Sequence, residues 1–377
     1  MKIKILIGHP YWGRGGAEFA TMWLIQALKD QYQISVITRG GWDLKSLNKF
    51  ANTTIEAENI SLVKLPFSKL LSQTKGGAIW NGFFLRYCRR IGKSFDIRIS
   101  AARPIDWGLP AVHILADVFW NDELYLKFGP PKTISETSGV RYLLGKIGTV
   151  IEGRSNRLIR DDRFIANSKW TAEISLKYCL LKPVIIYPPV LNIEFQKDWN
   201  SRENDFVYLG RISEEKKLEQ AIEIIEAVRN KGNLINFHIV GKIDSSIYST
   251  KILKICESKK SWIKLYGSKY GNEKYDILTS YKYGINCCEV EAFGISTVEM
   301  IKAGMIPFIN SSGGQKEIVN NEALCFINNE DAVLKICNLI KNNFFQDEIL
   351  NELRVQTKKF STEKFSSDIQ SFIQRIN

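Results

Sequence analysis

Residues 291–299 read Glu-Ala-Phe-Gly-Ile-Ser-Thr-Val-Glu, and the rest of the chain is best interpreted outward from this stretch. Directly before it, residues 283–288 form a short apolar run that ends in two cysteines, which is typical of a buried strand that stops at a loop. The residues after it read as a short helix followed by another strand at 305–309. We therefore expect Glu291 in a loop at the carboxyl end of a strand, and Glu299 in the first turn of a helix.

The middle of this stretch has the composition of an anion site. Phe293, Gly294, Ile295 and Ser296 would present backbone N–H groups at a helix start, where negative charge is favoured. The two flanking carboxylates suit the hydroxyls of a sugar, because each can accept two or more O–H bonds. An alternative is a capping box, in which Glu299 only bonds back to the backbone of Ser296. The sequence leaves both interpretations open.

Length and composition indicate a globular protein of two domains. The chain has 377 residues, of which 45% are hydrophobic and 24% charged. Its seven cysteines are scattered and form no C-x2-C pair, so we expect a reducing compartment and neither a disulfide framework nor a zinc site. No apolar run approaches the length of a membrane span, and the apolar start is too short for a signal peptide. We expect a cytoplasmic location.

The net charge of +12 is concentrated in residues 61–104. Nine basic residues and one acid, Asp96, fall in this segment; the basic residues are Lys64, Lys69, Lys75, Arg86, Arg89, Arg90, Lys93, Arg98 and Arg103. Such a surface favours anionic partners, and we expect an anionic membrane surface rather than nucleic acid, because no RNA-binding motif accompanies it. A helix here, with aromatic residues on one face and basic residues on the next, fits an interfacial membrane helix or a plain surface helix with its aromatic face in the core.

The start of the chain has the pattern strand, glycine-rich loop, helix. Residues 2–7 read as a buried strand, the loop carries Gly15 and Gly16, and a helix follows over 17–28. Glycines let the backbone approach a phosphate closely and a helix start favours its charge, although a tight structural turn would have the same composition. With a further strand at 33–38, the pattern predicts a parallel sheet.

Two polar residues lie in the strand expected at 111–118. His113 is one of only three histidines in the chain, and Asp117 follows it towards the strand's end. The histidine is either a residue of the site or a core histidine. Further on, Tyr187-Pro188-Pro189 ends a strand expected over 183–190, and a polar run then suits a linker.

The second half opens with a buried strand at 206–210. Gly210 ends it, and Arg211 and Lys216 flank the turn into the next helix. A solvated charged turn is the alternative to a binding role for these two cations. A later strand over 262–267 leads into a loop that begins with Gly267 and Ser268.

Together these features resemble the retaining glycosyltransferases of family 4. The E-x7-E signature matches Glu291 and Glu299, Gly-Arg-x4-Lys matches at 210–216, and a Gly-Gly-Ala-Glu loop matches at 15–18, in the family's order. The resemblance implies an α/β fold of the GT-B type, with two Rossmann-like parallel-sheet domains facing across a cleft. It places an acceptor domain at 1–195, a donor domain at 196–359, and a final helix at 360–377 that packs back on the first domain.

The resemblance also implies roles for these residues. Glu291 would hold the hydroxyls of the donor sugar and Glu299 the ribose, while the loop at 267–270 would lie against the base. Arg211, Lys216 and the amides of Gly16 and of residues 293–296 would neutralise the diphosphate. The family carries a histidine near the donor sugar, and His113 and Asp117 are the candidates for the cleft and the acceptor side. The sequence departs from the family at Lys217, where glycine is common.

The function implied is retaining transfer of a hexose from GDP-mannose or a UDP-sugar to a sugar or lipid-linked acceptor. The chain contains no Asp-x-Asp, so we expect no metal and no cofactor besides the nucleotide-sugar. The preference for mannose follows from a resemblance to the mannosyltransferases of lipid-linked glycan assembly. This resemblance implies that the protein binds peripherally to the inner face of the membrane. Alternatives are a nucleotide-sugar 2-epimerase of the same fold and a non-catalytic nucleotide-sugar binding protein.

Overall fold

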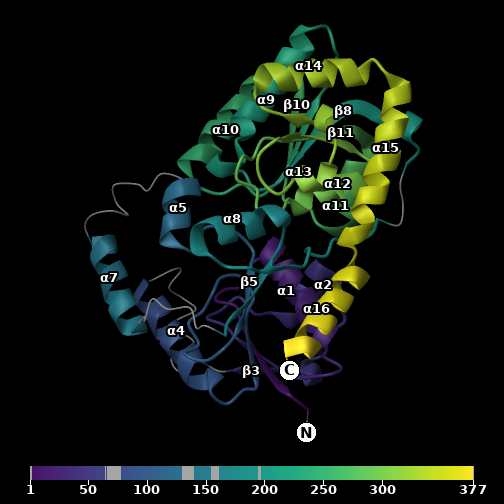
Figure 1. The fold of residues 1–377 in the computed structure, drawn as a ribbon. Helices are drawn as coiled ribbons and strands as arrows, with labels where there is room; N and C mark the ends of the chain where they lie inside the picture. The colour runs from purple at the N-terminus through teal and green to yellow at the C-terminus, as the bar shows by residue number, and fades with distance from the viewer. Residues whose placement is uncertain are drawn as a thin grey trace. The chain divides into compact units, whose positions relative to one another are not determined.

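The computed structural model describes residues 2–63, 65, 78–129, 140–153, 161–193 and 197–376. These residues form two compact units, drawn in Figure 1. Unit 1 comprises Met1–Pro189 and Glu363–Asn377, and unit 2 comprises Val190–Thr362. In both units the described strands pair only in parallel.

Unit 1 is built on a seven-stranded sheet in the order β3-β2-β1-β4-β5-β6-β7. Because parallel strands need crossovers, helices alternate with most of these strands along the chain. The elements are β1 (Lys4–Gly8), α1 (Gly16–Leu28), β2 (Gln33–Ile37), α2 (Leu44–Ala51), β3 (Ile60–Val63), α4 (Ala78–Gly92), β4 (Ile97–Ser100), β5 (Val112–Leu115), α5 (Asp122–Phe128), α7 (Val140–Glu152), β6 (Arg163–Ala166), α8 (Lys169–Cys179), β7 (Val184–Ile185) and α16 (Thr362–Ile376).

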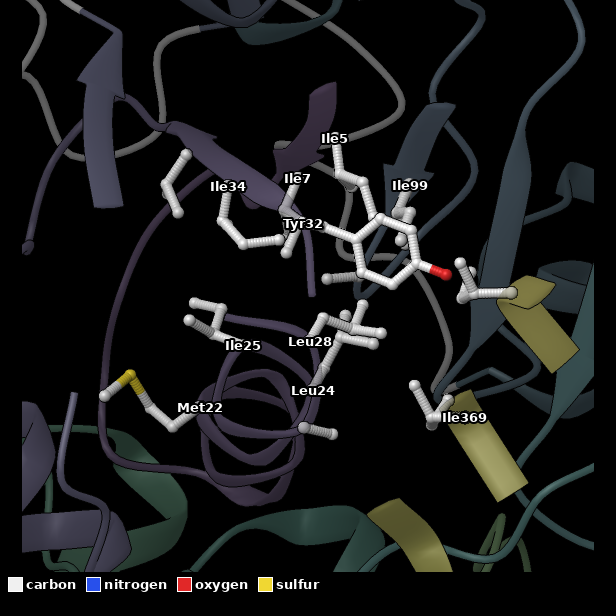
Figure 2. Packing of buried hydrophobic residues seen from close by; sticks show 14 of the residues in the cluster. Ile5, Ile7, Met22, Leu24, Ile25, Leu28, Tyr32, Ile34, Ile99 and Ile369 are labelled. Carbon is white, nitrogen blue, oxygen red and sulfur yellow. The ribbon is translucent and has the colours of Figure 1, made fainter. Parts of the chain in front are cut away.

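The core of unit 1 joins the start of the chain to its end. Figure 2 shows Ile5 and Ile7 of β1 near Leu24 and Leu28 of α1, with Ile369 of α16 close by. All five side chains are fully buried or nearly so, and each buried Leu or Ile contributes roughly 1.5–3 kcal/mol relative to an exposed one. The C-terminal helix is therefore a structural part of unit 1.

One strand of unit 1 is much shorter than expected. The sequence predicts a strand over 183–190, but only Val184–Ile185 pair with β6. Pro188 and Pro189 have no N–H to donate to a ladder, so the chain leaves the sheet before them.

Unit 2 contains a six-stranded sheet in the order β10-β9-β8-β11-β12-β13. Its inner strands are buried over most of their length, as a parallel sheet covered on both faces requires. The elements are β8 (Glu203–Leu209), α9 (Leu218–Asn230), β9 (Phe237–Val240), α10 (Ile247–Ser258), β10 (Ile263–Gly267), α11 (Gly271–Ser280), β11 (Tyr281–Asn286), α12 (Ile295–Lys302), β12 (Ile306–Asn310), α13 (Lys316–Val319), β13 (Cys325–Phe326), α14 (Asn329–Ile340) and α15 (Asn343–Thr357).

The chain joins unit 2 earlier than the expected boundary at 195/196. The N–H of Val190 already donates to the carbonyl oxygen of Phe360 at 2.9 Å, and the Val190 carbonyl oxygen accepts a hydrogen bond from the buried Lys302. These contacts fix the change of unit directly after Pro189 rather than in the polar run that follows. The expected second boundary, 359/360, falls three residues before the observed one, because Phe360 packs in unit 2 against Phe293.

The basic segment 61–104 is described only in part. Lys64, Lys69 and Lys75 lie outside the described residues. In α4 most of the aromatic residues face the core, with Phe84 buried and Trp80 and Tyr87 packed against the same cluster, whereas Phe83 is exposed. Across the described ranges, no helix is long and apolar enough to cross a membrane.

Candidate functional site

Lys216 and Glu291 form a half-buried ion pair in unit 2. Lys216 ends a short 3-10 turn after β8, Glu291 lies in the loop after β11, and these two strands are neighbours in the sheet. The carboxyl ends of adjacent parallel strands meet at one edge, so 75 residues of chain separate partners that touch. The Lys216 Nζ lies 2.6 Å from Glu291 Oε2, and the two side chains are only 19% and 15% exposed.

The surroundings of Lys216 keep its ammonium group charged. Burial by itself lowers the pKa of Lys216, but the Glu291 carboxylate and its hydrogen bond more than offset this, and the pKa is raised above its ordinary value. Arg211 is near enough for its charge to act in the opposite sense. Among the residues expected to meet a diphosphate, Lys216 is thus a fixed and protonated cation.

A second layer of contacts holds the Glu291 loop in place. Gly314 donates its N–H to the Glu291 carbonyl oxygen at 2.7 Å, and a Cβ on Gly313 would lie 2.6 Å from that oxygen. Gln315 is fully buried and donates to the Cys288 carbonyl oxygen at 3.0 Å. The Ser-Ser-Gly-Gly turn after β12 therefore supports the loop that carries Glu291.

The helix start after this loop depends on a glycine. Gly294 is the residue before α12 and has φ +109°, a conformation that residues with a Cβ rarely adopt. A Cβ there would also lie 3.1 Å from the Gln315 Cβ. Phe293 is buried against Phe360, while Ile295 and Ser296 are half-buried in the first turn of the helix. The backbone of this turn therefore begins a helix at the same loop as Glu291.

Glu299 pairs with Lys274 of α11, and the capping-box interpretation is wrong. The helix begins at Ile295, so Ser296 lies inside it, and the Glu299 Oε1 meets Lys274 Nζ at 2.5 Å. Burial lowers the pKa of Lys274, but Glu299 more than offsets it and the pKa is raised. Glu291 and Glu299 thus each pair with a different half-buried lysine.

The remaining residues expected in the donor site of unit 2 are more open. Arg211 is 69% exposed and its guanidinium lies 3.2 Å from Glu215. Gly210 donates its N–H to the Val240 carbonyl oxygen at the end of β8. Gly267 is half-buried with φ +68°, and Ser268 is exposed.

In unit 1, the glycine loop after β1 is closed by its own glutamate. Glu18 accepts hydrogen bonds from the N–H groups of Gly15 (3.0 Å) and Gly13 (3.4 Å), and α1 begins at Gly16. A carboxylate therefore lies where the loop amides point, which is the arrangement of an anion at a helix start.

His113 and Asp117 are not brought together. His113 is buried in β5, with Nδ1 3.0 Å from Ser100 Oγ and Nε2 3.3 Å from an Asp162 oxygen. These are the contacts of a core histidine, the alternative that the sequence left open. Asp117 accepts from the Phe119 N–H at 2.8 Å and has one oxygen 3.4 Å from Arg103. The catalytic roles of both residues stay predictions.

A metal-binding cluster is not found in the parts of the chain that the structure describes: no three His, Cys, Asp or Glu side chains there are grouped to hold an ion. At the Lys216–Glu291 site, Lys216 and Arg211 are cations that can meet an anion, and each faces a carboxylate, that of Glu291 and of Glu215 respectively.

Comparison with known proteins identifies unit 2. Residues 190–362 match the family model described as "Glycosyl transferases group 1". Unit 2 thus matches a group 1 glycosyl transferase domain over its whole length. Of the curated proteins, the poly(ribitol-phosphate) alpha-N-acetylglucosaminyltransferase of Staphylococcus aureus (strain COL) is 26% identical over 162 residues. That match covers 41% of this chain and 32% of the relative, so the chain matches about a third of the relative's length.

Solved structures show the same fold over the whole chain. Anabaena Alr3699/HepE in complex with UDP and glucose has a TM-score of 0.70 at 14% identity, covering 99% of each chain. A glycosyltransferase from Rickettsia africae ESF-5 has a TM-score of 0.67 at 17% identity, covering 100% of this chain and 98% of the other. These matches and the two parallel sheets confirm the expected GT-B fold around the group 1 domain.

Sequence reasoning gave no role to three residues that shape the site. Lys274 and Gln315 lie in segments whose polar residues give no pattern, and only the fold brings them to Glu299 and to the Glu291 loop. Glu18 did carry a signal, because an acid three residues after Gly15 is the spacing that bonds back to a helix start.

Proposed function

We propose that the protein is a retaining glycosyltransferase that moves a hexose from a nucleotide-sugar donor to a sugar or lipid-linked acceptor in glycan or polysaccharide synthesis, at the cytoplasmic face of a membrane. The half-buried Lys216–Glu291 pair is the observation that carries the proposal. It lies in the group 1 domain, at the strand edge where α/β sheets bind ligands.

The chemistry requires positive charge at the leaving diphosphate. Lys216 supplies a cation that stays protonated, Arg211 supplies a second and more exposed one, and the start of α12 supplies backbone N–H groups. We assign the sugar hydroxyls to Glu291, whose carboxylate also aims the Lys216 ammonium group, and the ribose to Glu299. With two side-chain cations in place, we propose that no metal is needed.

We propose that the leaving group itself acts as the base. The bond between the donor's anomeric carbon and its phosphate oxygen breaks, and the acceptor hydroxyl oxygen bonds to that carbon on the same face. The acceptor's proton passes to the departing phosphate oxygen, so that configuration is retained. Gly15 and Gly16 are assigned to the diphosphate, the loop at 267–270 to the base, and His113 and Asp117 to the acceptor side.

We infer that the donor is a UDP-sugar rather than GDP-mannose. One curated relative is named as an N-acetylglucosaminyltransferase, and a similar structure is described with UDP and glucose. Mannose transfer stays an alternative that the donor screen decides.

Thermal unfolding with UDP, GDP or ADP in the presence of EDTA tests donor binding. At a ligand concentration 100-fold above Kd, binding contributes about 2.7 kcal/mol, which raises the Tm of a unit of this size by roughly 5–10 °C. Lys216→Met should abolish the shift. Lys217→Met is the matched control, because Lys217 pairs with Glu289 in the same way but both side chains are 39–48% exposed. If no nucleotide shifts the unfolding temperature, or if both variants lose the shift equally, the assigned site is wrong.

Transfer is tested with Glu291→Gln and its control Glu289→Gln. We expect Glu291→Gln to lower kcat by a factor of roughly 10²–10³, and Glu289→Gln to change kcat little. The residual activity of Glu291→Gln should still form an α-linked product from an α-linked donor. An inverted product would refute retention, and activity that EDTA removes would refute metal independence. Conversion of the donor without an acceptor product would favour the 2-epimerase, and tight binding without turnover would favour the binding protein.

A further inference from the structure

Four exposed residues of α4 follow one another along one side of the helix. Phe83, Arg86, Arg90 and Lys93 are spaced three, four and three residues apart, with Lys93 just past the last turn, and all four are exposed. Residues at this spacing share a helix face. We call Arg86, Arg90 and Lys93 the α4 cation row. Among the described residues no acid pairs with any of the three, whereas the neighbouring Arg89 is paired with Asp106 at 2.6 Å.

The helix α7 exposes an apolar face. Leu143 and Val150 are 58% and 79% exposed, and Leu144 and Ile147 are exposed by more than a third. Leu143, Ile147 and Val150 are spaced four and three residues apart and so lie on one side of the helix. We call these four residues the α7 apolar face. A single exposed leucine is ordinary, but a whole helix face of them marks a surface that contacts another apolar phase.

The two features belong to two helices that pack directly against each other. A Cβ on Gly82 of α4 would lie 2.3 Å from the Gly148 carbonyl oxygen of α7, so the backbones are in direct contact. Arg89 donates to the carbonyl oxygens of Glu152 (3.3 Å) and Gly153 (3.1 Å) and thereby closes the end of α7. One open hollow of about 360 Å³ is lined by the cation row together with Arg89, Glu152 and Gly153.

We propose that the α4 cation row and the α7 apolar face dock together on an anionic lipid surface. An apolar protein partner would explain the apolar face but not the unpaired cations beside it, and a soluble polyanion would explain the cations alone. A bilayer with anionic headgroups supplies both, since apolar side chains enter the interface while basic side chains meet phosphates. At 13 residues, α7 is too short to span a bilayer and suits a position in its surface. The proposal does not rest on the transferase activity.

Flotation of the full chain with vesicles tests the docking. We expect binding to vesicles of phosphatidylcholine with 30% phosphatidylglycerol, little binding to phosphatidylcholine alone, and weaker binding at high salt. The double variant Arg86→Gln/Arg90→Gln should bind about thirtyfold more weakly, because each basic residue near such a surface contributes about fivefold. Leu143→Ser/Val150→Ser should also bind roughly tenfold more weakly.

Matched controls come from exposed residues of unit 2. Lys231→Gln/Lys254→Gln removes two exposed basic residues, and Leu234→Ser removes an apolar side chain that is 92% exposed. Neither should change vesicle binding, and every variant should keep the unfolding temperature and the nucleotide-induced shift of the unaltered protein. Equal binding to neutral vesicles, or anionic binding that the α4 variant leaves intact, would overturn the proposal. So would binding that inorganic polyphosphate abolishes while the α7 variant has no effect, because the row would then be a polyanion site.

Discussion

We expect Lys302 to hold in place the two segments at which the chain enters and leaves unit 2. It lies in the last turn of α12, is 9% exposed, and donates from Nζ to the carbonyl oxygens of Val190 (2.5 Å) and Phe360 (3.4 Å) and to Asn192 Oδ1 (3.0 Å). Val190 and Phe360 belong to the two places where the chain passes between units, and they also bond to each other at 2.9 Å. One ammonium group thus fixes both passages to the same helix.

The variant Lys302→Met keeps much of the side-chain volume and removes the charge. Hydrogen bonds to a charged group contribute about 1.5–3 kcal/mol each, and Phe360 O keeps its bond from Val190 while Val190 O loses a short one. We therefore expect a loss of about 3–5 kcal/mol of unfolding free energy for unit 2. For a unit of this size the loss corresponds to a fall in Tm of roughly 6–20 °C.

Hydrogen exchange resolved by segment is the suitable assay, because the two units need not unfold together. Protection of the amides of α12 and of residues 190–193 should fall, while that of β1 and α1 in unit 1 should stay unchanged. Lys341→Met, at an exposed position after α14, is the control and should cost less than about 0.5 kcal/mol. A Lys302→Met protein as stable as this control would refute the reasoning.

Two further perturbations test buried pairs in unit 2. Asp205 accepts from the N–H of Asn236 (2.7 Å) and from His238 Nε2 (3.0 Å); burial raises its pKa, but these hydrogen bonds more than offset it, and the pKa lies below the usual value. The pKa of Asp205 is lower in the folded state than in the unfolded state. Its stabilisation is therefore present above about pH 4 and is lost as the pH falls further towards the folded pKa. Urea unfolding between pH 6 and 2 should show a drop in unfolding free energy that Asp205→Asn removes. Glu299→Gln should lower the unfolding free energy by about 1–3 kcal/mol, because Lys274 then loses its partner. The double variant with Lys274→Met should lose less than the sum of the two single variants, and strictly additive losses would show that the pair is not coupled.

The sequence was sufficient to predict the candidate site residues that lie at the ends of strands. Apolar runs predicted β8 and β11, and parallel pairing places the ends of neighbouring strands at one edge, which is why Lys216 and Glu291 could both be expected at the donor site. Nothing in the sequence says that β8 and β11 are neighbours rather than separated by another strand. Their direct contact is a property of the sheet order and required the structure.

The sequence could not predict which of several chemically similar partners a side chain contacts. Glu299 could bond back to its own helix start or reach a lysine on another helix, and both satisfy a carboxylate equally well. The start of α12 decides between them: Gly294 alone tolerates φ +109°, so the helix begins at Ile295 and Ser296 cannot be its cap. The exposed side of α7 was missed for a related reason, since a helix that is apolar on several sides reads as a core helix until its neighbours are known.

The helix α12 ties these observations together physically. Its first turn follows the Glu291 loop, where a helix dipole favours an anion, and its last turn carries Lys302, where the dipole favours a cation. Arg202, whose burial lowers its pKa to about 10, donates to the Ala303 carbonyl oxygen at 2.7 Å and satisfies the same helix end. Eight residues span only about 12 Å, so the two ends of this helix lie close together. The proposed donor would therefore contact the same short helix whose last turn holds Val190 and Phe360 through Lys302.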